Sequence, residues 1–108
     1  MAVTTNTLLE KLDGLRSRFE EVSTLITDPS VIADQTRYVR LTKEYKELED
    51  LMQARKRYAE LLSNLQESKN LLLTETDTEL KELAREEVAA CEAEIPTCEE
   101  QIKLMLVP

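Results

Sequence analysis

The sequence has 108 residues, 42% of them hydrophobic and 33% charged, but it holds only three tyrosines, one phenylalanine and one glycine. Because sheets favour β-branched and aromatic residues joined by glycine-bearing turns, this composition predicts an all-α chain of about one domain. The formal net charge is −8, and an excess of carboxylates disfavours phosphate binding, so we expect protein partners and no direct nucleic-acid binding from this domain.

The first predicted helix begins at Thr7, where Thr7 to Glu10 matches a capping box. Apolar residues then recur at steps of four and three, which indicates one seam on one helix ending near Thr27. Gly14 lies off this seam and weakens the helix only slightly. The seam consists of Leu8, Leu12, Leu15, Phe19, Val22 and Ile26.

A break follows at Asp28-Pro29-Ser30, because proline disfavours a helical conformation in the residue before it. We expect the next two apolar residues, Val31 and Ile32, to be tucked under the end of the helical packing. Asp34 is then placed to cap the next helix.

The second predicted helix, from Asp34 to Leu72, is uninterrupted by glycine or proline and organises the rest of the chain. Its apolar row is broken once, by Arg55. A helix this long cannot bury the row against itself, so the segments that precede and follow it in the sequence are its expected partners. The row consists of Tyr38, Leu41, Tyr45, Leu48, Met52, Ala59, Leu62 and Leu65.

The basic run Arg55-Lys56-Arg57 on this helix has two interpretations. It contacts phosphate or an acidic partner, or it pairs with the acidic third helix in an antiparallel hairpin. The pattern favours the second, in which the run lies beside Glu92, Glu94, Glu99 and Glu100.

A turn from Thr74 to Thr78 precedes the third helix, with a second capping box at Thr76 to Glu79. Between Glu75 and Glu100 there are ten acidic and two basic residues, against twelve of each elsewhere. Pro96 falls inside the helix, and because the apolar row resumes after it we expect a kink there. The row consists of Leu80, Ala84, Val88, Cys91, Ile95, Cys98, Ile102 and Met105.

The two cysteines, Cys91 and Cys98, lie seven positions apart, about 10 Å on one helix, which is too far for a disulfide. We expect small buried thiols and no metal site, in a cytoplasmic protein. The start of the chain shows no secretory signal, and no stretch of about 18 apolar residues predicts a membrane span.

Catalytic chemistry is not predicted. Without histidine the chain has no Ser-His or Cys-His nucleophile, and one glycine excludes phosphate and dinucleotide loops. Neighbouring carboxylates such as Glu86 and Glu87 point about 100° apart on a helix. The tyrosines are expected to pack in the core, with Tyr58 one position beside the row. We therefore predict no enzyme, no catalytic, cofactor-binding or metal-binding residue, and no cofactor.

These elements predict an all-α fold, a three-helix antiparallel coiled-coil-like bundle with a long central helix. The second and third helices form the hairpin, and the first packs along it. Unpaired apolar surface near the stretch from Leu104 to Pro108 leaves self-association of the fragment open.

One stretch carries a family resemblance. This stretch resembles the N-terminal domain of bacterial class I peptide chain release factors. It consists of Asp28-Pro29-Ser30-Val31-Ile32-Ala33-Asp34-Gln35-Thr36-Arg37-Tyr38, followed by Leu41-Thr42-Lys43-Glu44-Tyr45 and Leu48. The order of elements from Leu8 to Pro108 is similar too. In this family the paralogue that reads the other stop codon usually has a Trp after the proline of this turn. The chain has no Trp, which favours the factor 1 branch.

The resemblance implies that the full-length protein recognises UAA and UAG in the ribosomal A site and promotes peptidyl-tRNA hydrolysis through a Gly-Gly-Gln loop. The glutamine is a methylation target, and a Pro-x-Thr type tripeptide reads the codon. Neither motif occurs in residues 1–108. We therefore expect a truncated helical N-terminal domain that performs neither step itself.

In this family the first domain is an arm toward the stalk base of the large ribosomal subunit. The implied partners are the ribosome at that site, the class II release-factor GTPase and, through the full-length protein, a glutamine methyltransferase. The alternative is a structural coiled-coil adaptor or a tRNA-synthetase-like helical arm. Its expected basic face could come only from Arg55 to Arg57.

Overall fold

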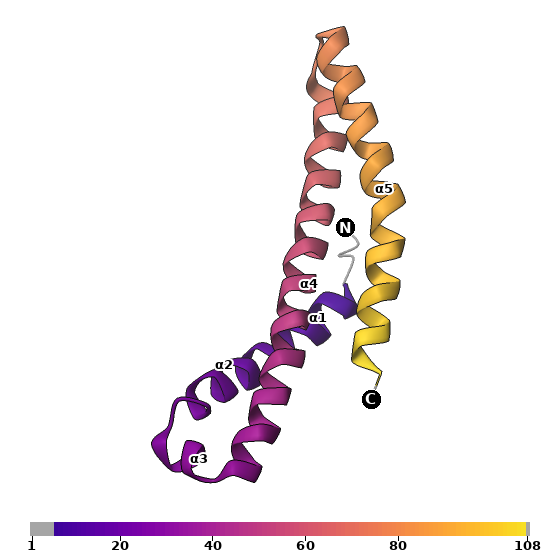
Figure 1. Cartoon of the computed structure of the whole chain (residues 1–108). Coiled ribbons are helices and arrows are strands. Elements are labelled where there is room, and N and C mark those ends of the chain that lie inside the picture. Colours follow the sequence, from indigo (N-terminus) through magenta and orange to yellow (C-terminus); the bar gives the residue numbers. More distant parts are fainter. Residues whose placement is uncertain (1–5, 108) are drawn as a thin grey trace. The chain divides into compact units, whose positions relative to one another are not determined.

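The computed structural model of the protein describes residues 6–107, and this part of the chain is helical with no strand. It confirms the all-α prediction. The five helices (Figure 1) are α1 (Thr7–Gly14), α2 (Arg16–Leu25), α3 (Pro29–Ala33), α4 (Gln35–Thr74) and α5 (Thr78–Leu106).

The chain divides into two compact units, residues 1–55 and 56–108, and α4 contributes its first half to one and its second half to the other. The long central helix is therefore confirmed. A single three-helix bundle is not confirmed, because the segment expected to be the first helix forms α1 and α2 and belongs to the first unit alone.

The division between α1 and α2 lies at Leu15. The N–H of Leu15 donates to the carbonyl of Leu12 at 3.1 Å, and the N–H of Phe19 donates to the carbonyl of Leu15 at 3.0 Å. Leu15 keeps right-handed helical dihedral angles (φ −85°, ψ −11°), so the backbone stays in the helical region between the two helices. The predicted cap is wrong by one residue. Asn6, not Thr7, caps α1 by accepting from the N–H of Leu9 at 3.0 Å.

The Asp-Pro turn forms a short helix, α3, instead of an irregular connection. Asp28 caps it, accepting from the N–H of Ser30 at 2.8 Å, and proline occupies the first turn, where its missing N–H costs nothing. Val31 is buried as expected, but Ile32 is 52% exposed, which contradicts its predicted burial. Asp34 caps α4 as predicted, through the N–H of Arg37 at 3.2 Å.

The core of the first unit joins α2 and α3 to the first half of α4. The rings of Phe19 and Tyr45 stack with centroids 5.4 Å apart. Tyr38 is 36% exposed, so its predicted core position is wrong. The buried apolar residues are Leu12, Val22, Val31, Leu41, Leu48 and Leu51.

The second unit is an antiparallel helical hairpin, in which α5 returns along the second half of α4 (Figure 1). Tyr58 and Leu61 are buried on α4, so the buried row lies one position from the predicted Ala59 and Leu62, which are half-buried. Leu51 is buried in place of the predicted Met52, so the shift of the row by one position begins directly after Leu48. The buried apolar residues of α5 are Ala84, Cys91, Cys98 and Ile102.

The hairpin turn lies where it was predicted, between Thr74 and Thr78, but the cap is Asp77 and not Thr76. Asp77 accepts from the N–H groups of Glu79 and Leu80 at 2.9 and 3.2 Å. α5 then runs through Pro96 without ending. Two residues of its predicted row, Leu80 and Met105, are exposed.

Candidate docking surface

The register of the hairpin is fixed by side chains of α4 and α5 that meet across it. The buried Tyr58 donates its hydroxyl to Oε2 of Glu99 at 2.7 Å. One residue earlier, the guanidinium of Arg57 donates to the carboxylate of Glu94. Residues 57 and 58 therefore lie beside residues 94 to 99, as the antiparallel prediction requires.

The basic run divides between two pairings. Arg57 pairs with the acidic α5, which confirms that interpretation for this residue. Arg55 instead pairs with Asp13 of α1, with Nε 2.7 Å from Oδ1. Lys56 is exposed. Of the other named glutamates, Glu100 lies 3.8 Å from Nζ of Lys103 on its own helix.

The two cysteines are free and buried, as predicted. Burial raises the pKa of the Cys91 thiol above its ordinary value, and its hydrogen bond to Glu87 acts in the same direction. Burial also raises the pKa of Cys98. Burial therefore disfavours the thiolate form of both side chains, which suits a role as packing groups.

In the first unit, an Arg-carboxylate pair fastens α2 to α4. Arg18 donates to Glu44 through Nε at 2.6 Å and through a terminal nitrogen at 2.8 Å. The hydrogen bond from Arg18 lowers the pKa of Glu44, and the same bond raises the pKa of Arg18. The bidentate geometry gives the pair a fixed orientation.

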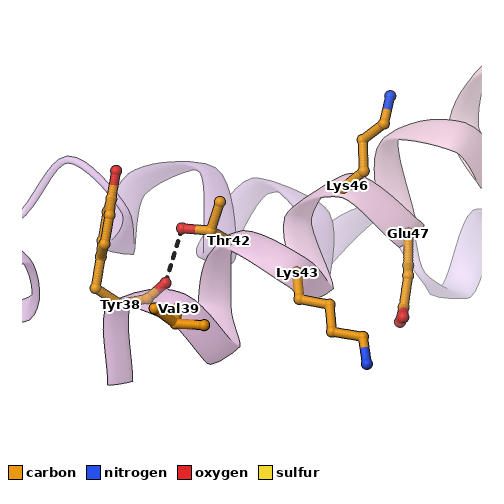
Figure 2. A pocket seen from close by; sticks show the side chains of 6 residues that line it. All are labelled: Tyr38, Val39, Thr42, Lys43, Lys46 and Glu47. Carbon is orange, nitrogen blue, oxygen red and sulfur yellow. Dashed lines mark hydrogen bonds between the residues drawn. The ribbon is translucent and has the colours of Figure 1, made fainter. Parts of the chain in front are cut away.

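The outer face of the first turns of α4 is both basic and apolar. Figure 2 shows Tyr38, Val39, Thr42, Lys43, Lys46 and Glu47 around a shallow hollow on this face. Thr42 donates its hydroxyl to the carbonyl of Tyr38 at 2.7 Å, and Val39 is 60% exposed. The ammonium group of Lys46 lies 3.3 Å from Asp50, and this interaction raises its pKa. The hollow is open and amphipathic, which suits contact with a protein surface more than enclosure of a small substrate.

The tip of the hairpin carries exposed leucines on both helices. Leu71 and Leu73 are 39% and 85% exposed near the end of α4, and Leu80 and Leu83 are 44% and 60% exposed at the start of α5. Exposed apolar residues in such number near one end of an element are typical of an interaction surface. The sequence signal for this surface is the presence of apolar residues outside the predicted rows, such as Leu73 and Leu83.

Within residues 6–107 no group of three or more thiols and carboxylates is arranged to hold a metal ion. In the same range, no helix is both long and apolar enough to cross a lipid bilayer. The described surfaces include exposed helix faces with leucines and charged side chains.

Comparison with known proteins adds the family. The PCRF domain matches residues 15–108, which include all of α2 to α5. The chain belongs to the PCRF domain family. This confirms the resemblance first carried by the stretch from Asp28 to Leu48.

Several curated proteins are similar in sequence to this PCRF chain. The chain is 62% identical over 103 residues to "Peptide chain release factor 1" of Bacteroides thetaiotaomicron, covering 95% of the chain and 28% of that protein. It is 57% identical over 103 residues to the protein of the same name from Parabacteroides distasonis, with the same coverage. The Flavobacterium psychrophilum protein of that name is 37% identical over 101 residues, covering 94% of the chain and 28% of the relative.

This PCRF chain thus spans 28% of the length of the curated relatives that it matches. No solved structure matches it.

Proposed function

We propose that this chain is the docking module of a peptide chain release factor of the factor 1 type, a translation termination factor. The observation that carries the proposal is the 62% identity to proteins named peptide chain release factor 1 over 95% of the chain. The match of the PCRF domain to residues 15–108 supports it independently.

The proposed activity of the whole protein is recognition of UAA and UAG in the ribosomal A site, followed by hydrolysis of peptidyl-tRNA. Residues 1–108 contain one glycine, Gly14, and so no Gly-Gly-Gln loop. The hydrolytic and codon-reading motifs, and the glutamine that a methyltransferase would modify, would lie in the remainder of the protein. The chain itself would act by binding, in the cytoplasm.

For the chain, the proposed role is an arm that docks onto protein at the stalk base of the large ribosomal subunit and onto the class II release-factor GTPase. Charge supports a basic partner for the hairpin. Residues 56–108 hold twelve acidic and six basic residues, a net charge of −6, whereas residues 1–55 hold ten and eight, a net charge of −2. The exposed leucines near the tip supply apolar contact area beside these carboxylates.

The adaptor and synthetase-arm alternatives have no comparable support. Their basis was the helical pattern, which many coiled coils share, and the run Arg55 to Arg57. Arg55 and Arg57 pair with Asp13 and Glu94, which disfavours this run as the basic face of a tRNA-binding arm.

The first test is to sequence the source gene beyond the codon for Pro108. We expect a Pro-x-Thr type tripeptide and a Gly-Gly-Gln in the same reading frame. A downstream sequence that lacks both would overturn the assignment to a release factor.

The docking role is tested by competition. The 108-residue chain, added in excess, should slow peptide release by the full-length factor on ribosomes stalled at UAA. The matched control is Ala84→Arg, which places a charge at a buried position of the hairpin and should abolish the inhibition. If the wild-type chain does not inhibit release at any concentration up to a 100-fold excess, the docking role is wrong.

A further inference from the structure

The two flanks of the α4–α5 hairpin differ in charge and in apolar content. In an antiparallel helix pair, positions that directly precede an inward residue lie on the same flank of both helices. Leu71 precedes the half-buried Leu72, and Leu80 precedes the half-buried Lys81. Leu83 stands three positions after Leu80, beside it on the helix surface. Leu71, Leu80 and Leu83 therefore share one flank, which we call the leucine flank.

An observed contact checks this assignment. By the same rule Arg57 precedes the inward Tyr58, and Glu94 precedes the half-buried Ile95, so both belong to the leucine flank. The structure pairs these two side chains directly across the hairpin. The leucine flank is thus continuous from the Arg57–Glu94 pair to the leucines near the tip.

Acidic residues line the rest of the leucine flank. Helical spacing places Glu60 and Glu67 of α4 and Glu87 of α5 on it, all of them exposed. With Glu94 this makes four carboxylates against Arg57, a net charge of −3. The opposite flank is neutral, with three acidic residues against three basic ones. Those residues are Glu82, Glu92, Glu99, Lys69, Arg85 and Lys103.

We propose that the leucine flank binds a basic amphipathic helix of another protein, laid along the hairpin. The partner's apolar residues would contact Leu71, Leu80 and Leu83, while its Lys or Arg residues would meet Glu60 and Glu67. Glu60 to Leu71 spans eleven residues, about 16 Å of helix, which is the length of about three turns of such a partner. This inference rests on the proposed docking function and deepens it by naming the surface and the chemistry of the partner.

The probe is an 18-residue peptide with leucines at helical spacing and lysines flanking them, labelled for fluorescence anisotropy. It is titrated with the 108-residue chain at 50 mM and 500 mM salt. A second peptide with glutamate in place of every lysine is the charge control. We expect the basic peptide to bind at least tenfold more tightly than the acidic one at low salt, and the difference to shrink at high salt.

Variants then locate the binding surface. Leu80→Gln combined with Leu83→Gln should weaken binding of the basic peptide at least tenfold. Leu73→Gln changes a more exposed leucine on the opposite flank and should leave the affinity within twofold. Circular dichroism and the urea midpoint establish that each variant is folded.

A second pair of variants tests the charges. Glu60→Gln combined with Glu67→Gln should weaken binding at least threefold at 50 mM salt. The matched control, Glu92→Gln combined with Glu100→Gln, removes the same charge elsewhere and should have less than half of that effect.

The proposal is overturned if the acidic peptide binds equally well. It is also overturned if Leu73→Gln causes an equal loss, or if the two glutamate pairs cause equal losses. Ribosome competition separates this result from the docking role. If the Leu80→Gln, Leu83→Gln double variant still competes fully, the leucine flank is not the binding surface, while the docking role of the chain stands. If the peptide binds through the leucine flank but the chain does not compete on the ribosome, the leucine flank is a binding surface and the docking role is wrong.

Discussion

The hydroxyl of Tyr58 lies 2.7 Å from Oε2 of Glu99 and donates a hydrogen bond to it from a side chain that is 1% exposed. It joins a residue in the middle of α4 to one near the end of α5, 41 positions later in the chain. A bond between a buried donor and a carboxylate permits one alignment of the two helices, so it selects the register of the hairpin.

Removing this hydroxyl should destabilise the protein. Tyr58→Phe keeps the buried ring and loses the bond, so we expect the free energy of unfolding in urea to fall by about 1–2 kcal/mol. A double-mutant cycle with Glu99→Ala isolates the interaction, because the two changes should be less than additive. Strict additivity would show that the contact contributes nothing to stability.

The pair between Arg18 and Glu44 should make stability depend on pH. The pKa of Glu44 in the folded protein is lowered from 4.5 by its hydrogen bond with Arg18. The stabilisation is therefore fully present above pH 4.5 and is lost as the pH falls through the lower, folded-state value. Urea midpoints of wild type and Glu44→Gln should differ at pH 6 and converge as the pH falls below 4.5. A difference that persists undiminished at pH 2.5 would contradict this account.

The contrast between Val31 and Ile32 in α3 is testable by truncation. Val31 is 1% exposed, so Val31→Ala should lower the free energy of unfolding by about 2 kcal/mol through lost contacts and a residual void. Ile32 is 52% exposed, so Ile32→Ala should change it by less than about 0.5 kcal/mol. Chemical denaturation of the two variants side by side measures both. Equal effects would mean that α3 does not pack through Val31 alone.

Pro96 should limit the stability of α5. It has no N–H to donate to the carbonyl of Glu92, one turn earlier, and it lies at an exposed position inside the helix. Pro96→Ala should therefore raise the free energy of unfolding by about 1–3 kcal/mol, less the entropy that proline removes from the unfolded chain. Thermal and urea unfolding report the change, with the exposed Ala93→Ser as a matched helix variant. No gain in stability would indicate that the helix is distorted at this point for another reason.

Helix type and the location of the turns could be predicted from the sequence, because apolar spacing and the Asp-Pro and Thr-rich breaks are local signals. The cap of α4, Asp34, is the predicted one, but the caps of α1 and α5 each lie one residue from the predicted position. Thr7 and Thr76 fit the capping-box pattern, but the adjacent Asn6 and Asp77 are equally good or better caps and took the position.

Burial was harder to predict, because it depends on which helices face each other. Tyr58 was expected beside the core and is nearly inaccessible, while Tyr38 fits the apolar row and is exposed. The row continues past Leu15 without a sign of the division between α1 and α2. The leucine flank could not be read from one helix, since it depends on two helices meeting in one register.

The two thiols of α5 give the hairpin a built-in reporter of its own opening. Cys91 and Cys98 face α4 seven residues apart and are 2% and 9% exposed. A reagent that alkylates thiolates can reach them only in molecules whose helices have separated, so the modification rate measures how often separation occurs. Because no other cysteine is present in the 108 residues, the native sequence needs no label. A partner that clamps the hairpin closed would then reveal itself as a slower alkylation of both sulfur atoms.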